Sequence, residues 1–277
     1  MNGPTTSYSY NTANELTSKV LNSTTTTYAY DANGNLTGNS GGLSISYNAQ
    51  NQSTSMNGTT NSYTSADQTQ RVASGSTSAV YTQLGLDSET SSAGTTYYIR
   101  CSCSALAGER TPTGTYYYLF DGLGSVVGLT NSTGAVVATY AYDPYGNLTS
   151  STGTVSNPWR YASGYYDSFT SFYKFGIRYY DPSTGRWTQR MPIGGSLQEL
   201  VKANPYTYAD NNPTNEVDPT GKLGCFTVLD RGIEEIISVS GLLVVLIGLL
   251  VYDAATGLIG ISVGIVLNLI NDLRNRK

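Results

Sequence analysis

The sequence predicts a mainly β fold made of antiparallel hairpin repeats that stack edge to edge into a curved sheet. One stretch occurs twice, fainter copies of it recur at a regular spacing, and strand-favouring residues are abundant. The stretch "TYAYDANGNLT" at 27–37 returns as "TYAYDPYGNLT" at 139–149, and nine of the eleven positions are identical. The chain has 24 tyrosines among 277 residues, whereas disordered chains are poor in aromatic residues.

Each copy of this stretch reads as a hairpin. Tyr28 and Tyr30 are two positions apart, so they share one face of an extended chain, and threonine and tyrosine both favour strands. The segment 31–34 then reads as a turn, because Asn-Gly tolerates positive φ and aspartate can bond its own backbone. In the second copy, Pro144 presets φ for the same turn.

Weaker copies of the pattern occur in the first half of the chain. They are "YSYNTANELT" at 8–17, "ISYNAQNQST" at 45–54 and a faint echo around Tyr63. A period of about 20 residues is typical of a repeat architecture. Because a single hairpin cannot bury its own apolar face, we expect neighbouring hairpins to stack.

The remaining elements follow from local composition. Segment 97–114 reads as a strand, a loop and a turn, and 172–187 reads as an aromatic strand pair around a turn. Segment 204–221 is rich in turn-forming residues, and 196–203 is the one helix that the sequence predicts within residues 1–221. Three further strands are expected at 116–120, 126–129 and 135–142.

Composition limits the functional classes. The chain has no histidine, which excludes Ser-His and Cys-His catalysis and histidine-ligated metals; we expect no cofactor. Only 12% of the residues are charged, the net charge is −4, and no basic patch stands out, so nucleic acid is not an expected partner. The three cysteines, Cys101, Cys103 and Cys225, are too few for a disulfide framework, so we expect free thiols.

The first residues contain neither a basic segment nor an apolar run, so they do not form a signal peptide. The chain opens almost inside a repeat and reads as the end of something longer. A secreted or cell-surface, membrane-associated location is the one we expect.

Residues 115–221 resemble the RHS repeat-associated core, and the upstream copies resemble YD repeats, which take their name from the pair seen here as Tyr30-Asp31 and Tyr142-Asp143. The resemblance covers about 220 residues. The matching core stretches, in order, are "DGLGSVVGLTNSTGAVVATYAYDPYGN", "ASGYYDSFTSFYKFGIRYYDPSTGRW" and "NPYTYADNNPTNEVDPTG".

This resemblance implies a long β-sheet that spirals into a hollow shell, as in Tc toxin shell components, bacterial polymorphic toxins and teneurins. In bacterial members the shell encloses a variable C-terminal segment, commonly a toxin. The composition changes abruptly after Gly221. We therefore expect YD-repeat hairpins at 1–114, the RHS core at 115–221 and a variable tail at 222–277, with too few repeats for a closed shell.

The resemblance also implies self-cleavage just past a DPxG motif, carried out by two aspartates and an arginine. Asp218 of "DPTG" matches one aspartate and Arg178 matches the arginine, but Met191 stands where the second aspartate belongs. A thioether cannot share a proton as a carboxylate pair does, so we expect no cleavage. Asp210 is a weak substitute, and Asp218 can equally serve as a turn residue.

Two apolar runs of 17 residues follow the core, at 236–252 and 254–270, with Asp253 between them. Each lies at the lower limit of a membrane-spanning helix, so they predict a helical hairpin. The alternative is a pair of buried helices packed against the sheet. Membrane insertion is favoured because these helices are apolar on all sides rather than striped.

The leading interpretation is therefore a structural β-shell fragment that carries a membrane-active, toxin-like tail. One alternative is a self-cleaving aspartyl-type core that releases the residues after about 223. Another is a cell-surface adhesion module with a membrane anchor. The expected partners are a membrane, through residues 236–270, and an immunity or delivery protein.

Overall fold

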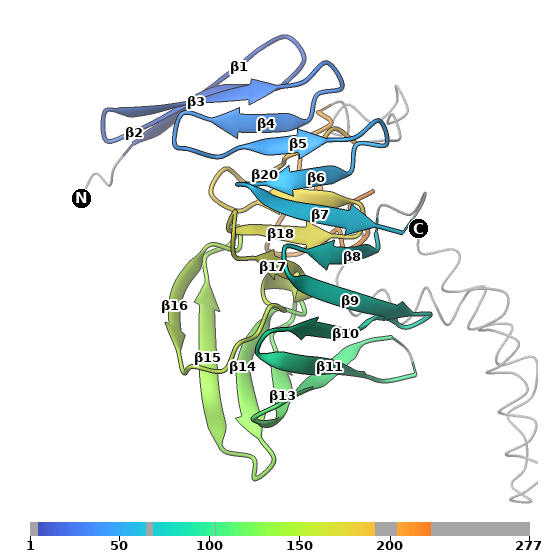
Figure 1. Cartoon of the computed structure of the whole chain (residues 1–277). Coiled ribbons are helices and arrows are strands. Elements are labelled where there is room, and N and C mark those ends of the chain that lie inside the picture. The colour runs from blue at the N-terminus through green and yellow to red at the C-terminus, as the bar shows by residue number, and fades with distance from the viewer. Residues whose placement is uncertain (1–4, 65–68, 103, 192–203, 223–277) are drawn as a thin grey trace, which may run out of the picture. The chain divides into compact units, whose positions relative to one another are not determined.

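The computed structural model describes residues 5–64, 69–102, 104–191 and 204–222, all of which belong to one unit, Met1–Thr227 (Figure 1). The predicted helix at 196–203 and the predicted helical hairpin at 236–270 lie outside these residues. Within the described stretches, no helix combines the length and apolar character that a membrane span requires.

The first part of the unit is a wall of consecutive antiparallel strands, β1 to β16, each paired with the next along the chain except at one junction. The wall spans residues 6–152 and confirms the mainly β prediction. Its strands are β1 (Thr6–Tyr10), β2 (Leu16–Leu21), β3 (Thr24–Tyr30), β4 (Leu36–Asn39), β5 (Ile45–Tyr47), β6 (Ser53–Met56), β7 (Thr59–Tyr63), β8 (Arg71–Ser74), β9 (Thr77–Thr82), β10 (Gly85–Ser91), β11 (Gly94–Arg100), β12 (Leu106–Thr111), β13 (Gly114–Phe120), β14 (Val126–Asn131), β15 (Val136–Tyr142) and β16 (Leu148–Thr152).

The junction between β4 and β5 divides the wall into a sheet of β1–β4 and a 12-stranded sheet of β5–β16. A single bridge, Gly38 to Ser44, connects the two. A Cβ atom on Gly38 would lie 2.5 Å from the carbonyl oxygen of Leu43, so glycine permits the close approach. The larger sheet ends at β16 without closing on itself, as expected for a partial shell.

One turn recurs along the wall and explains the repeated aspartate. The Oδ1 atom of Asp31 accepts hydrogen bonds from the backbone N–H groups of Asn33 and Asn35, both at 2.9 Å. Gly34 has φ of +79°, and its N–H donates to the Asp31 carbonyl at 3.0 Å. This is a type I turn followed by a left-handed bulge residue. The same bonds recur in the turns that begin at Asn11, Asn39, Asn48, Asp121, Asn131 and Asp143.

The second part of the unit is a plug, residues 156–191 and 204–222. Its antiparallel sheet contains β17 (Tyr165–Asp167), β18 (Phe172–Phe175), β19 (Arg178–Asp181) and β20 (Arg186–Trp187), and it has two short 3₁₀ segments, η1 (Tyr161–Ser163) and η3 (Ala209–Asn211). Its core is aromatic: the rings of Tyr180 and Tyr208 stack with centroids 4.1 Å apart, and Trp187 packs edge-on against both.

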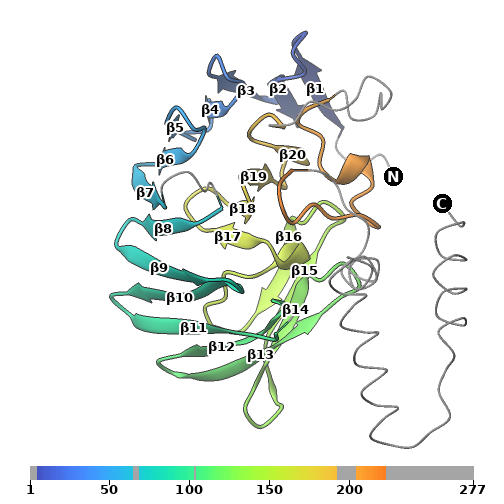
Figure 2. The ribbon, with the colours of Figure 1, turned by 90° about the vertical axis from the view of Figure 1, so that its right-hand side faces the viewer.

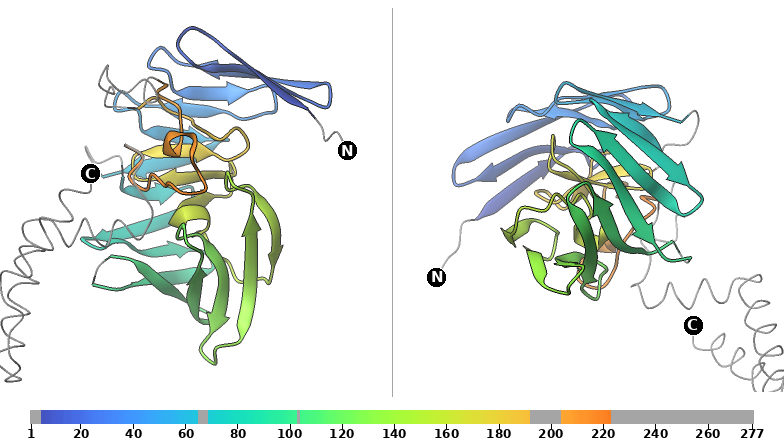
Figure 3. Two further views of the ribbon diagram at one scale, coloured as in Figure 1. Left: turned by 180° about the vertical axis from the view of Figure 1, so that it is seen from behind. Right: turned by 60° about the horizontal axis from the view of Figure 1, so that its bottom comes forward.

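The wall curves around the plug, with β17–β20 on its concave side (Figures 2 and 3). Apolar residues join the two parts: Leu36, Ile45 and Met56 of the wall pack with Phe172 and Tyr179 of the plug. Burial of such side chains contributes roughly 1.5–3 kcal/mol each.

Three local predictions need correction. Segment 97–114 contains two paired strands, β11 and β12, rather than one, because the turn at 101–105 closes a hairpin. Segment 172–187 contains three strands rather than two, because a second turn follows β19. Cys101 is disulfide-bonded and is therefore not the free thiol that the cysteine count predicted.

Candidate functional site

Arg178 on β19 lies at the centre of a buried cluster inside the plug. Its Nη2 atom is 3.2 Å from Oδ2 of Asp218, and only 3% and 1% of the two side chains are exposed. The guanidinium also donates to the carbonyls of Gly221 and Pro205, and its carbon lies 4.1 Å from the centre of the Trp187 ring. One side chain thus joins β19, β20 and the two segments around residues 205 and 218–221.

Two glycines allow the "DPTG" turn to lie against the hairpin of β18 and β19. The N–H of Ile177 donates to the Thr220 carbonyl at 3.1 Å. A Cβ atom on Gly176 would lie 2.0 Å from the Thr220 oxygen, and one on Gly221 would lie 2.5 Å from the Phe175 oxygen. Both glycines also have positive φ, which disfavours other residues. The sequence folds locally in this way because side chains are absent where the backbones touch.

Asp218 has two roles in this cluster. Its Oδ2 atom pairs with Arg178, while its Oδ1 atom accepts from the Thr220 hydroxyl and the Lys222 N–H, both at 3.2 Å. Burial raises the pKa of Asp218, and the positive charge of Arg178 opposes that rise. Burial also disfavours the charged form of Arg178 and lowers its pKa to about 10, while the charge of Asp218 opposes that shift. The carboxylate therefore caps the turn through which the chain leaves the plug.

The other two predicted positions lie differently. The backbone N–H of Met191 donates at 3.0 Å to the Pro205 carbonyl, which also accepts from Arg178, so position 191 lies beside the cluster. Asp210 sits in η3 with a left-handed φ of +47°. No hydrogen bond or ion pair among the described residues joins Asp210 to Arg178 or Asp218. Among the described residues, the arrangement is one carboxylate with one guanidinium, without the second acid that a proton-sharing pair requires.

A second buried ion pair, which sequence reasoning missed, joins the wall to the plug. Arg71 on β8 contacts Asp167 on β17 at 2.6 Å, with side chains 6% and 2% exposed, and it donates to the Tyr179 hydroxyl at 3.1 Å. Nearby, the Tyr165 hydroxyl donates to Glu89 of β10 at 2.7 Å. The "YYD" spelling of 165–167 gave a signal for a strand, but nothing local signals its partners, which lie 76 and 96 residues away.

Glu109 on β12 is a buried acid within the wall. Its side chain is fully buried, Oε2 accepts from the Tyr118 hydroxyl at 2.9 Å, and Oε1 has no hydrogen-bond partner in the part of the chain that the structure describes. Burial raises the pKa of Glu109 to about 7; Glu89 adds to the rise and the Tyr118 hydroxyl opposes it. No cluster of potential metal ligands occurs among the described residues.

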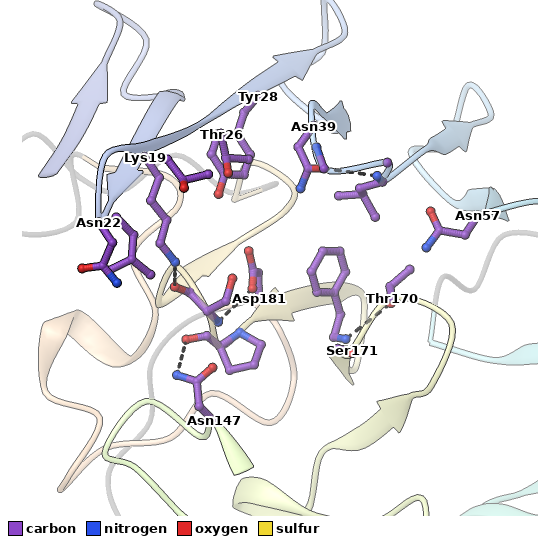
Figure 4. A pocket seen from close by; sticks show the side chains of 18 residues that line it. Lys19, Asn22, Thr26, Tyr28, Asn39, Asn57, Asn147, Thr170, Ser171 and Asp181 are labelled. Atoms are coloured by element: carbon purple, nitrogen blue, oxygen red, sulfur yellow. Dashed lines mark hydrogen bonds between the residues drawn. The ribbon is translucent and has the colours of Figure 1, made fainter. Parts of the chain in front are cut away.

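A cavity of about 710 Å³ lies between the wall and the plug on one side (Figure 4). Thr24, Thr26 and Tyr28 line it from one face of β3, and Asp181 lines it from the plug. Two bonds bridge the gap beside it: Lys19 Nζ to the Ser183 carbonyl at 2.8 Å, and Asn57 Nδ2 to the Phe169 carbonyl at 2.7 Å. Leu21, Leu43 and Phe172 also line it, so its lining mixes polar and apolar side chains.

Known proteins match part of this chain. Residues 89–214 match the family model described as Teneurin YD-shell. The tRNA(Glu)-specific nuclease WapA of Bacillus subtilis subsp. natto is 39% identical over 116 residues, which are 41% of this chain and 5% of that protein. Double-stranded DNA deaminase toxin A of Burkholderia cenocepacia is 30% identical over 118 residues, 41% of this chain and 8% of that protein.

Toxin protein Tse5 of Pseudomonas aeruginosa is 38% identical over 66 residues, 24% of this chain and 5% of that protein. The chain thus spans only 5% to 8% of the length of these curated relatives. Among solved structures, TcdB2-TccC3 without its hypervariable C-terminal region aligns with a TM-score of 0.47 and 15% identity, over 78% of this chain and 15% of that one.

Proposed function

This chain belongs to the RHS/YD-repeat family, and we propose on that premise that residues 5–222 are a section of a β-shell, made of wall and plug together. We further propose that residues 222–277 are the variable segment of this shell. The function of the described part is geometric: a curved wall surrounds a space, and the plug occupies its concave side. The observation that carries the proposal is the packing of the plug against the concave face, through buried apolar and charged contacts.

The relatives support a scaffold role for the shared segment. Their names state a tRNA nuclease, a double-stranded DNA deaminase and a toxin. A segment that accompanies such different activities, and that makes up 5% to 8% of each protein, supplies something other than the reaction itself. The described residues fit that reasoning, because the buried acids Asp167, Asp218 and Glu109 bond to Arg71, Arg178 and Tyr118, respectively.

For the tail, we propose membrane association through residues 236–270. Two charge-free runs of 17 residues support this, because each leucine, isoleucine, valine or phenylalanine near a helix centre favours insertion by roughly 0.3–0.6 kcal/mol. Asp253 would be costly in the middle of a membrane and belongs at the bend of a hairpin. An immunity or delivery protein would then be the partner of the tail.

Limited proteolysis of the full chain tests both parts of this proposal. Proteinase K should leave one protected fragment that ends soon after Lys222, whereas cuts between wall strands would contradict the shell. The full chain should float with phosphatidylcholine–phosphatidylglycerol liposomes, and the trimmed fragment should not. Val245→Asp, in the middle of the first run, is the matched control and should reduce flotation. Dye leakage separates a pore from an anchor, and a full chain that fails to float rules out the membrane role.

Self-cleavage is the second candidate function, and one observation favours a cleavage site that has lost one of its two acids. Position 191 and Arg178 share the Pro205 carbonyl, so an acid at 191 would be near the retained Arg178–Asp218 pair. We expect the full chain to keep its mass during incubation and Met191→Asp to produce a fragment that starts near Gly224. Adding Asp218→Asn should abolish that cut. A fragment from the unmodified chain would show that the methionine does not prevent cleavage.

A further inference from the structure

In five wall turns that face the plug, the same backbone atom, the carbonyl oxygen of the fourth turn residue, contacts the plug. Each turn has the form described above, and its fourth residue has left-handed φ between +59° and +88°. The carbonyl of that fourth residue accepts a hydrogen bond from a plug side chain. The five bonds are Arg186 to Asn14, Tyr206 to Gly34 at 2.7 Å, Gln189 to Asn51 at 2.7 Å, Ser163 to Gly124 at 2.7 Å and Tyr173 to Gly146 at 2.9 Å.

The acceptor is constant while the donors vary. The donors comprise a guanidinium, an amide, an alcohol and two phenols, so no single type of side chain defines the contact. Gly34 and Gly146 are buried, where an unpaired backbone carbonyl is unfavourable, and at the other three turns a different type of donor makes the same bond. The plug thus recognises turn backbone, which is the same in every repeat.

Backbone recognition alone does not select among repeats, but the space around the fourth residue does. A Cβ atom on Gly34 would lie 2.2 Å from Cδ of Arg190 and 2.6 Å from the Tyr206 oxygen. A Cβ atom on Gly146 would lie 2.6 Å from the Tyr161 ring. The equivalent residues Asn14 and Asn51 carry side chains in the same backbone conformation, and Oδ1 of Asn51 accepts from Asn35 at 2.9 Å.

We propose that the row of plug donors is a recognition surface for left-handed hairpin turns, and that Gly34 and Gly146 fix which turn docks at which donor. Sliding the wall by one hairpin would bring Asn51 to the place of Gly34, against Arg190 and Tyr206. This inference deepens the proposed shell function by naming how the plug selects its place on a repetitive wall. At the donors Tyr206 and Tyr173 the natural ligand is a turn of the Asp-x-x-Gly form, without a side chain at the fourth position.

The opposite edge of the wall supplies matched controls. Gly42 and Gly134 occupy the fourth position of the same kind of turn, with φ of +99° and +82°, and a Cβ atom on either would meet nothing within 4 Å. Alanine at these sites carries only the penalty of positive φ. Alanine at Gly34 or Gly146 carries that same penalty and also displaces the plug.

The experiment compares four alanine variants of the full chain by thermal unfolding and by amide hydrogen exchange. Gly34→Ala and Gly146→Ala should lower the melting temperature at least about twice as much as Gly42→Ala and Gly134→Ala. They should also abolish the exchange protection of β18 and β19, which the two controls should retain. Equal effects at all four sites would overturn the proposal.

Tyr173→Phe and Tyr206→Phe cover the case in which an alanine variant does not fold. Each keeps the ring and removes one donor, so exchange should rise at the turn it contacts, 143–147 or 31–35, and at no other turn. Unchanged exchange at both turns would also overturn the proposal. These readouts concern only the docking of wall and plug, so they stand apart from the flotation and proteolysis results that test the shell and its tail.

Discussion

The wall and the plug obtain their order in different ways. In the wall, each strand except at the β4–β5 junction pairs with its sequence neighbour. Many of its side chains are exposed to solvent: all five residues of β16 are exposed, and Thr26 to Tyr30 of β3 alternate between half-buried and exposed positions. In the plug, all residues of β18 and β19 are buried. The wall is built from repeated hairpins whose contacts are local. The plug, in contrast, has an aromatic core that occurs once. The contacts between them should therefore contribute more to stability than any single contact within a repeat.

The largest effect should come from the ion pair that joins the two parts. Arg71→Met leaves Asp167 buried without its partner, and we expect the free energy of unfolding to fall by about 3–5 kcal/mol. Urea denaturation measures it, with the fluorescence of Trp159 and Trp187 as the probe. Arg110→Met is the control: this guanidinium lies 4.7 Å from the half-exposed ring of Tyr97 on a single wall hairpin, where such a contact contributes about 0.5–1 kcal/mol. Equal losses of unfolding free energy in the two variants would mean that a contact between wall and plug contributes no more to stability than a contact within one wall hairpin.

The next effect depends on pH and arises inside the wall. The pKa of Glu109 is about 7 in the folded chain against about 4.3 for an unperturbed glutamate, so the native state favours the protonated acid. The stability that this preference supplies is complete below about pH 4 and is lost as the pH rises through 7. Glu109→Gln stays neutral, so at pH 8 its free energy of unfolding should exceed that of the parent by about 3–4 kcal/mol.

At pH 4 the same variant should match the parent, because the parent carboxyl is then protonated in both states. Urea midpoints at a series of pH values provide the measurement. A constant difference between the two proteins from pH 4 to pH 8 would mean that the carboxyl has the same pKa in the folded and the unfolded chain, so that burial does not raise it.

The smallest effect should come from a single turn. Asp31→Ala removes the acceptor of two backbone N–H groups, and we expect a loss of about 1 kcal/mol. Asp31→Asn should cost less, since asparagine makes the same bonds at the start of four other turns. If the free energy of unfolding falls as much in Asp31→Ala as in Arg71→Met, a single repeat contributes more to stability than the comparison of wall and plug implies.

The local structure of this protein was readable from the sequence alone. The Tyr-x-Tyr-Asp spacing and the Asn-Gly turn predicted the hairpins, because every bond of the 31–35 turn lies within five residues. Segments 97–114 and 172–187 were exceptions. In the first, the turn at 101–105 lacks the Asp or Asn that marks the other turns, so β12 went unpredicted. The pairing of Arg178 with Asp218, 40 residues apart, was indicated by the family resemblance rather than by local chemistry.

Only the tertiary structure decided how the wall meets the plug. Arg71 and Asp167 are 96 residues apart, and nothing near either residue in sequence distinguishes a buried partner from a solvated one. The glycines at 34, 42, 134 and 146 have the same role in their turns, yet side chains of distant segments crowd two of them and leave two open. A repeat determines its own hairpin through bonds between near neighbours, whereas its place in the shell depends on contacts that exist only after the chain has folded back on itself.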